Sequence, residues 1–246
     1  MKRALVTGGQ QGIGFGIAKA LAGAGFDVVI AAELPPEAEV VQSALAALPG
    51  ARYLRHDLAG VDGIEALLDA VGPVTCLVSN AGVPAKLRGD MLNMTPESFD
   101  FVMDINLRGA FFLAQAVARR MLETVSGDYR SILFVTSVSA ALVSVERAEY
   151  CLSKSAAAMM AQLFAVRLAP HDIGVFDLRP GIIDTGMTAG VKGKYDALIA
   201  GGLVPAGRWG QPADVASVAV PLALGQMAFA TGAVIPVDGG LSIGRL

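Results

Sequence analysis

Three side chains able to do acid–base chemistry stand at fixed spacings in the second half of the chain. Tyr150 and Lys154 are four residues apart, and Ser137 lies thirteen residues before the tyrosine. If residues 148–169 form a helix, Tyr150 and Lys154 lie one turn apart on the same face. An ammonium beside a phenol favours the phenolate, so such a tyrosine can give or take a proton near neutral pH. The spacing therefore predicts a proton-transfer site.

The elements that must position these residues follow an alternating pattern along the whole chain. Short apolar β-rich runs, mostly without polar interruptions, are typical of strands covered by helices on both faces. The alternation predicts one α/β domain over residues 1–246, built on a parallel sheet. The expected strands are Arg3–Thr7, Asp27–Ala32, Arg52–His56, Val74–Ser79, Arg130–Thr136, Gly174–Leu178 and Ala233–Val237. The expected helices are 13–24, 37–47, 61–71, 96–122, 148–169 and 212–224.

Two further segments need an interpretation. Residues 186–209 hold several glycines, Pro205 and one short helical piece, and this irregularity predicts a substrate lid. Residues 215–237 carry no charge over 23 positions, but prolines and glycines interrupt them. We therefore expect a buried helix, a turn and a final strand there rather than a membrane span.

Composition excludes several classes of protein. The net charge is −3 and no Lys/Arg cluster marks a nucleic-acid surface. The hydrophobic share of 54% against 17% charged residues favours an oligomer with apolar interfaces. Cys76 and Cys151 have neither metal-ligand nor CxxC spacing, so we expect no metal and no disulfide. A strand-like run begins close to Met1, so we expect no signal peptide and a cytoplasmic location.

The first expected strand leads into a glycine-rich turn and then a helix. The turn is Thr7-Gly8-Gly9-Gln10-Gln11-Gly12-Ile13-Gly14. Glycines let the backbone approach a pyrophosphate, and the helix N-terminus offers N–H groups and the positive end of its dipole. The turn predicts a dinucleotide site, with a ligand-free glycine-rich turn as the alternative.

Other polar residues fall at the ends of later strands. Glu33, nineteen residues after Gly14, could bind two ribose hydroxyls or be a solvated loop residue. Asp57 could accept a hydrogen bond from an adenine amino group or cap the next helix. The segment 80–82, Asn-Ala-Gly, could bridge strand ends and admit a cofactor, or form a plain turn. Ligands of open parallel sheets bind at the carboxyl ends of the strands, so these residues are expected to share one site.

Together, TGxxxGIG, Asn80-Ala81-Gly82, Ser137, Tyr150-x-x-x-Lys154 and Pro180-Gly181 resemble the short-chain dehydrogenase/reductase family. The resemblance extends from Arg3 to Val237-Asp238-Gly239-Gly240. It implies a single Rossmann-fold domain with a doubly wound parallel sheet of seven strands, ordered 3-2-1-4-5-6-7, and helices on both faces. It also implies a homotetramer and hydride transfer between a nicotinamide cofactor and a carbonyl or secondary alcohol.

The resemblance further implies a role for each matching residue. Tyr150 would be the general acid in reduction and the base in oxidation, with Lys154 favouring its ionised form and holding the nicotinamide ribose. Ser137 would bind the substrate oxygen. Asn106 matches an asparagine that kinks a long helix and holds a water in a proton relay, although it could be an ordinary polar residue inside a helix. The cofactor-binding residues would be Gly8, Gln10, Gln11, Gly12, Ile13, Gly14, Glu33, Asp57, Leu58, Asn80, Ala81, Gly82, Tyr150, Lys154, Pro180, Gly181, Ile183 and Thr185.

The cofactor choice depends on three positions. Relatives that prefer NADP carry a basic residue where this chain has Gln11 or Glu33. Relatives that prefer NAD carry aspartate at the place of Ala32, and here the acid follows one residue later. No cation is expected near a 2′-phosphate, so NAD is the predicted cofactor and NADP the alternative.

A small-molecule substrate is the expected partner, and an acyl chain on a carrier protein is the alternative. Family members that reduce 3-oxoacyl-acyl-carrier-protein carry an arginine in the loop after the Tyr–Lys helix, where this chain has 170–172, Pro-His-Asp. Arg119 and Arg120 are the remaining candidates for that contact. The polar residues expected around the pocket are Ser139, Glu146, Arg147 and Glu149, although Glu146 and Arg147 could equally belong to a solvated loop.

This polar lining favours a small sugar-like or polyol-like hydroxy or keto compound. The alternative is a 3-oxoacyl-acyl-carrier-protein reductase. A remote alternative is a non-catalytic nucleotide-binding regulatory protein, which would be expected to lack Ser137, Tyr150 or Lys154. All three residues are present.

Overall fold

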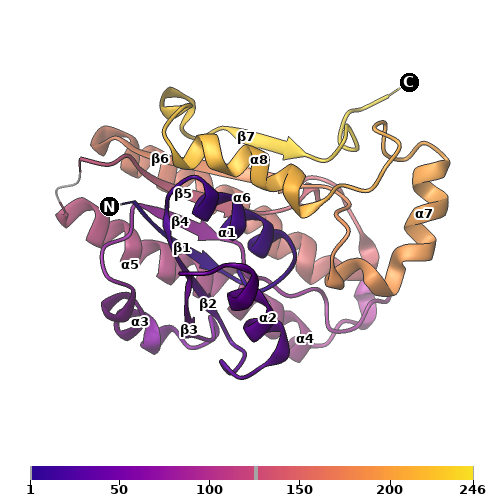
Figure 1. Ribbon diagram of the computed structural model, residues 1–246. Coiled ribbons are helices and arrows are strands. Elements are labelled where there is room, and N and C mark those ends of the chain that lie inside the picture. The colour runs from indigo at the N-terminus through magenta and orange to yellow at the C-terminus, as the bar shows by residue number, and fades with distance from the viewer. Residues whose placement is uncertain (1, 125–126, 246) are drawn as a thin grey trace.

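A parallel sheet of seven strands forms the centre of the molecule, in the order β3-β2-β1-β4-β5-β6-β7 (Figure 1). The computed structural model describes residues 2–124 and 127–245. The predicted topology is confirmed, and every registered strand pair is parallel. The strands are β1 Arg3–Thr7, β2 Asp27–Ala32, β3 Arg52–Arg55, β4 Cys76–Ser79, β5 Arg130–Val135, β6 Ile173–Pro180 and β7 Val234–Val237.

Helices fill the intervals between the strands. They are α1 Gly12–Gly23, α2 Glu39–Ala47, α3 Ile64–Val71, α4 Pro96–Met103, α5 Ala110–Glu123, α6 Ala148–Leu168, α7 Lys192–Ala200 and α8 Pro212–Ala223. A π-helical turn, Asp104–Gly109, joins α4 to α5. Short 3₁₀ turns cover Val61–Gly63, Met91–Asn93, Val138–Ala140, Val145–Arg147, Ala169–His171, Gly186–Val191 and Ala228–Ala230. The segment predicted to be a lid contains α7, which lies at one end of the molecule (Figure 1).

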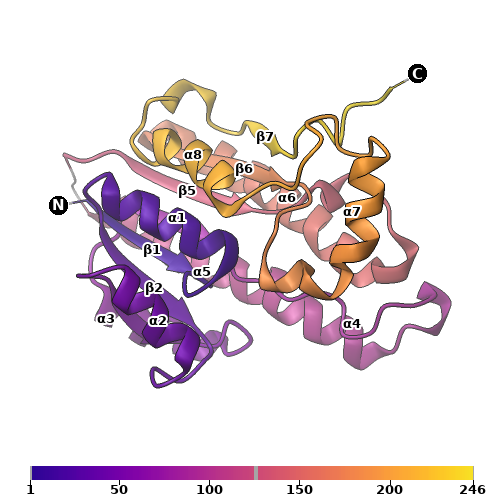
Figure 2. The same ribbon diagram turned by 45° about the vertical axis from the view of Figure 1, so that its right-hand side comes forward.

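Alternation along each strand divides the core into two layers. Leu5 of β1 belongs to one apolar cluster, whereas its neighbours Ala4 and Val6 belong to the other. The first cluster packs β-strand residues against α3, α5 and α6, and the second packs them against α1 and α8 (Figure 2). Because successive side chains point to opposite faces, strands that are apolar throughout can support both layers.

One helical stretch of the described residues has the length and hydropathy needed to cross a membrane. It is Pro96–Glu123, which spans α4, the π turn and α5, and 50% of its most apolar window is buried inside the molecule. Burial of that degree is what a helix packed on a sheet requires. The uncharged residues 215–237 form most of α8, a turn and β7, as predicted.

Candidate active site

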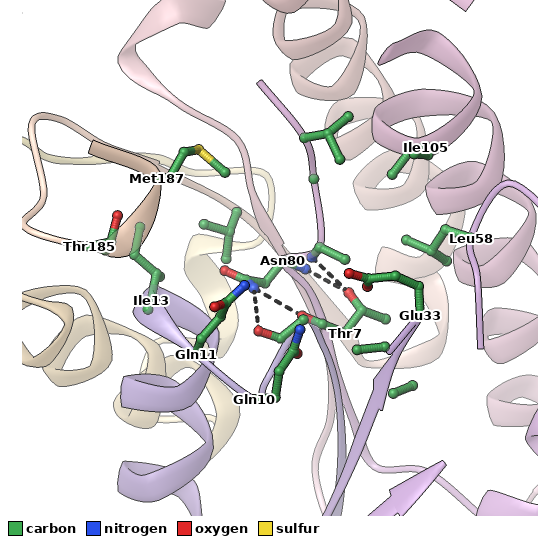
Figure 3. A pocket seen from close by; sticks show the side chains of 18 of the residues that line it. Thr7, Gln10, Gln11, Ile13, Glu33, Leu58, Asn80, Ile105, Thr185 and Met187 are labelled. Atoms are coloured by element: carbon green, nitrogen blue, oxygen red, sulfur yellow. Dashed lines mark hydrogen bonds between the residues drawn. The ribbon is translucent and has the colours of Figure 1, made fainter. Parts of the chain in front are cut away.

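The carboxyl ends of the strands border a cavity of about 380 Å³ (Figure 3). Most of the predicted cofactor residues line it. These are Gly8, Gln10, Gln11, Gly12, Ile13, Glu33, Asp57, Leu58, Asn80, Ala81, Gly82, Tyr150, Lys154 and Thr185. Gly14, Pro180, Gly181 and Ile183 are not lining residues. The structure therefore brings residues from widely separated parts of the chain to one edge of the sheet.

The glycine-rich turn is shaped by close contacts. Gly8 and Gly12 have φ angles of 65° and 54°, a conformation that L-residues with a side chain rarely adopt. A β-carbon on Gly14 would lie 2.3 Å from the carbonyl oxygen of Gly8, so Gly14 serves the packing of α1 against the turn. No side chain caps the start of α1 at Gln11, and its first N–H groups are available to an anion.

Two buried polar atoms in the cavity wall have no hydrogen-bond partner within the described part of the chain. They are Oε1 of Gln10, a residue only 5% exposed, and Nε2 of His56. Burial lowers the pKa of His56, although Asp57 nearby acts in the opposite direction. Buried polar atoms are normally paired, and these two are suited to the hydroxyls and ring nitrogens of a nucleotide.

Thr7 and Asn80 fasten the ends of β1 and β4 together. The side-chain amide of Asn80 donates to the carbonyl oxygen of Thr7 at 2.9 Å, and the backbone N–H groups of Asn80 and Ala81 both donate to Thr7 Oγ1 at 3.0 Å (Figure 3). The predicted bridging by Asn80 is confirmed. These bonds fix the backbone where Asn80-Ala81-Gly82 lines the cavity.

Opposite charges lie close together just beyond the ends of β2 and β3. Glu33 is exposed at the end of β2, and Nε of Arg55 donates to its backbone carbonyl at 2.9 Å. Arg55 is not a lining residue of the cavity, but the pairing of β3 with β2 places this cation beside Glu33, where the sequence predicted none. Asp57 lines the cavity, and its carboxylate accepts a hydrogen bond from the N–H of Ala59 in a local turn. It does not cap the next helix, because Gly60 and Gly63 are the N-cap residues of the following 3₁₀ turn and of α3.

Tyr150 and Lys154 line the cavity from α6, one turn apart as predicted. The Lys154 ammonium lies 5.7 Å from the centre of the Tyr150 ring and donates to the carbonyl oxygen of Val135 at 3.1 Å. Lys154 is 6% exposed and has no carboxylate within ion-pair distance in the part of the chain that the structure describes. A buried cation needs polar partners, so its remaining donors suit ligand oxygens in the cavity.

Ser137 follows β5 and begins the 3₁₀ turn Val138–Ala140. Its Oγ accepts a hydrogen bond from the N–H of Ser139 at 3.0 Å, and the residue is 9% exposed. Ser137 is not itself a lining residue of the cavity, whereas its neighbour Thr136 is. Because the Ser137 oxygen accepts this bond from Ser139, the Ser137 hydroxyl proton remains available for donation to a ligand.

Asn106 sits in the π-helical turn that interrupts the predicted helix 96–122. Its Oδ1 accepts from the N–H of Val83 at 2.7 Å, and its Nδ2 donates to the Val83 carbonyl at 3.0 Å and to Ser153 Oγ at 3.1 Å. A β-carbon on Gly109, at the end of the same turn, would lie 1.9 Å from the carbonyl oxygen of Leu58. Such π turns cluster at functional sites because they re-aim side chains and free carbonyls.

The four residues expected to form a polar substrate lining are not lining residues of the cavity, and they differ in placement. Arg147 lies 5.3 Å from the centre of the Tyr150 ring and donates to Ser139 Oγ at 3.1 Å. Glu146 is largely exposed and 3.8 Å from Lys194. Glu149 is 3% exposed and accepts a hydrogen bond from Ser98 of α4, so the expectation that it lines a pocket is wrong. Glu149 lies in the first turn of α6 and points into the contact between α6 and α4 instead.

Several lining residues were missed by sequence analysis. Phe101, Ile105, Val135 and Met187 are apolar, and no motif marks them. Thr136 and His56 directly precede predicted site residues, so their position at the end of a strand was a usable signal.

Comparison with known proteins agrees with this geometry. The family described as "Enoyl-(Acyl carrier protein) reductase", a short-chain dehydrogenase family, matches residues 8–242. The 3-oxoacyl-[acyl-carrier-protein] reductase MabA of Mycobacterium tuberculosis is 36% identical over 98% of this chain and 93% of its own length. The 2-dehydro-3-deoxy-D-gluconate 5-dehydrogenase of Dickeya dadantii is 33% identical over 97% of this chain and 94% of its own length.

A solved structure is closer still. The 3-oxoacyl-[acyl-carrier protein] reductase from Brucella melitensis in complex with NAD superposes with a TM-score of 0.94 at 49% identity. It covers 100% of this chain and 98% of its own.

A dinucleotide-binding α/β fold with an acid–base pair at the cofactor edge defines an oxidoreductase. The chain belongs to the short-chain dehydrogenase/reductase family, whose members act on CH–OH groups with NAD or NADP. The residues present fit such a cofactor, since the cavity combines a glycine turn, an uncapped helix start and unpartnered buried polar atoms.

Proposed function

We propose that the protein transfers hydride between NAD and a carbonyl or secondary-alcohol carbon of a small polar substrate. The observation that carries this proposal is the placement of Tyr150 and Lys154 in the same cavity as the glycine-rich turn. A proton donor and a dinucleotide site are both needed for this reaction, and here one cavity contains both.

The cofactor, when bound, supplies the hydride chemistry at its nicotinamide ring. The N-terminus of α1 and the turn Gly8–Gly14 hold the pyrophosphate, and Asp57 with Leu58 contacts the adenine. Asn80-Ala81-Gly82 supports the middle of the dinucleotide. Residues 180–185, through Pro180-Gly181, the backbone of Ile183 and Thr185, contact the nicotinamide end.

The protein itself moves the proton. Tyr150 donates it to the substrate oxygen in reduction and accepts it in oxidation, while Lys154 holds the nicotinamide ribose. Ser137 donates its free hydroxyl proton to the same substrate oxygen. Asn106 donates to Ser153 of α6, the helix that carries Tyr150, and to the carbonyl of Val83. In this proposal Asn106 also holds a water in a proton relay to Tyr150.

NAD is the proposed cofactor because Glu33 lies where the adenosine ribose is expected. Its carboxylate suits two ribose hydroxyls and repels a 2′-phosphate. Arg55 lies beside it and would stabilise a 2′-phosphate, so discrimination depends on the balance between these two side chains.

A sugar-like or polyol-like substrate is favoured over an acyl chain on a carrier protein. Arg120 is already engaged by Glu65 and Asp69 of α3 at 2.6 and 2.7 Å, and the loop after α6 lacks an arginine. Reduction of a 3-oxoacyl-acyl-carrier protein is the second candidate, favoured by the 49% identity to the Brucella melitensis reductase.

The segment 186–209 serves as a substrate lid in this proposal. Met187 lines the cavity, and the segment is fastened by bonds from Lys192 to Asp184 at 2.9 Å and from Trp209 to Asp196 at 2.7 Å. Because these bonds are exposed, they can open at modest cost.

A cytoplasmic homotetramer completes the proposal. The apolar side chains exposed on α5 and α6 offer a surface for subunit contact, and they are Phe112, Leu152, Met159, Leu163 and Val166.

The test is an absorbance assay of reduced nicotinamide with sugars, polyols, sugar acids and 3-oxoacyl thioesters, each with NAD and NADP. Turnover of a polar hydroxy or keto compound with NAD supports the proposal. Turnover confined to 3-oxoacyl thioesters supports the second candidate instead. Binding of NAD without turnover of any compound would contradict the enzymatic roles given to Tyr150 and Ser137.

A further inference from the structure

We infer that the substrate carries a carboxylate and that Arg147 binds it. This inference rests on the proposed function and deepens it, because it names the chemical class of the compound whose carbonyl or alcohol meets Tyr150. Arg147 lies at the N-terminus of a helix, where a positive charge is electrostatically unfavourable.

Arg147 sits where a cation is electrostatically unfavourable. It is the N-cap residue of α6, a helix of 21 residues, and a helix N-terminus carries partial positive charge. The half-buried side chain lies 5.3 Å from the centre of the Tyr150 ring, and the ammonium of Lys154 contacts the same ring at 5.7 Å. Two cations and a helix N-terminus around one phenol make an anion-attracting site.

The carboxylates nearest in the sequence are committed elsewhere. Glu146 lies 3.8 Å from Lys194, and buried Glu149 accepts a hydrogen bond from Ser98. Within the described residues, Arg147 forms no ion pair, and its printed hydrogen bond is the one to Ser139. Most of the five N–H donors of the guanidinium therefore remain for a ligand.

Ser139 orients the arginine from a fixed position. It is 3% exposed, and its backbone N–H donates to Ser137 Oγ, the group assigned to the substrate oxygen. Ser139 thus contacts both the Ser137 hydroxyl, which is proposed to bind the reacting oxygen, and the Arg147 guanidinium, which is proposed to bind the carboxylate. The planar fork of arginine matches a carboxylate in two parallel hydrogen bonds, whereas a neutral polyol offers no such pair.

The rival explanation is structural, in which Arg147 only supports the ring of Tyr150 through a cation–π contact. The two explanations differ in what they predict for matched substrates. A structural role affects charged and neutral substrates alike, whereas a binding role affects the charged one selectively.

The experiment compares sugar acids with the polyols that carry a hydroxymethyl group in place of the carboxylate, D-gluconate and D-glucitol among them. The ratio of kcat/KM for the acid to that for the polyol is measured in wild type, Arg147→Gln and Arg147→Lys. We expect the ratio to fall about 10- to 100-fold in Arg147→Gln, the loss of a charged hydrogen-bonded contact, and less in Arg147→Lys. Arg167→Gln, which removes an exposed cation from the last turn of α6, is the matched control.

A binding measurement makes the result independent of turnover. With NAD at saturation, the same sugar acids should raise the melting temperature of wild type and of Arg167→Gln but not of Arg147→Gln. An equal loss of kcat/KM for acid and polyol, or no thermal shift with any sugar acid, would overturn the inference. Failure of NAD itself to shift the melting temperature would instead count against the proposed cofactor.

Discussion

The side-chain amide of Asn106 binds both the N–H and the carbonyl of Val83, at 2.7 and 3.0 Å. The two residues are far apart in the sequence, and the pair ties the loop after β4 to the π turn between α4 and α5. Because Val83 lines the cavity and Asn106 also contacts Ser153 of α6, this amide positions three walls of the site at once.

Asn106→Ala should therefore lower stability and activity together. It leaves the partly buried N–H of Val83 without its acceptor, and the expected cost is toward the lower end of the about 1–3 kcal/mol of an unsatisfied buried group. Urea unfolding measures the loss, and Asn93→Ala, at an exposed position, provides the control. An unchanged urea midpoint for Asn106→Ala would mean that water replaces the Asn106 side chain with no loss of stability, and would contradict this prediction.

Tyr150→Phe should reduce turnover at least about a hundredfold, because the ring remains and only the transferable proton is lost. The affinity for NAD, measured by fluorescence titration, should be nearly unchanged. Tyr129→Phe is the control, since its buried hydroxyl has no partner in the described structure and does not line the cavity. Wild-type turnover in Tyr150→Phe would remove the tyrosine from the mechanism.

Glu33→Ala should weaken NAD binding more than NADP binding, because it removes the acceptor for the ribose hydroxyls and the repulsion of a 2′-phosphate. Arg55→Ala should do the reverse and weaken NADP selectively, through loss of the cation beside Glu33. Calorimetric titration of both cofactors against both variants measures the two effects. A wild type that prefers NADP tenfold or more would contradict the choice of NAD.

Gly14→Ala should abolish cofactor binding or folding. Its β-carbon would lie 2.3 Å from Gly8 O and 2.5 Å from Asn80 Nδ2, and neither neighbour can move without opening the turn. Gly23→Ala in the same helix meets nothing within 4 Å and should be neutral or raise stability by up to about 1 kcal/mol. Thermal melts with and without NAD distinguish the two variants, and equal behaviour would contradict the assigned packing role.

Low pH should weaken the ion pair between Arg208 and Asp214 at the start of α8. The Arg208 guanidinium, followed by the N–H of Gln211, lowers the pKa of Asp214 from 3.8 to about 2. A carboxyl with a lowered pKa contributes stability above its unfolded value and loses it as pH falls through its folded value. The stability difference between wild type and Asp214→Asn should thus be largest above pH 4 and shrink between pH 4 and pH 2. Because the pair is partly exposed, the difference is small, and a constant difference over that range would refute the linkage.

Sequence analysis predicted the strands and most site residues because their signals are local. Apolar runs define the strands, and many of the proposed cofactor residues, such as Gly8, Glu33 and Asn80, follow the end of one. Arg55 and Glu149 show where this reasoning stops. The neighbour of Glu33 depends on the register between β2 and β3, and the burial of Glu149 depends on how α4 crosses α6. Neither relationship is encoded in a short stretch of chain.

The close approach of Gly109 to the backbone of Leu58 joins the side of the cavity proposed for the adenine to the turn that carries Asn106. No side chain fits between them, so a backbone shift on one side must be transmitted to the other. A redesign of the nucleotide preference through the loop after β3 is therefore expected to disturb the proposed proton delivery unless the backbone at Leu58 stays in place.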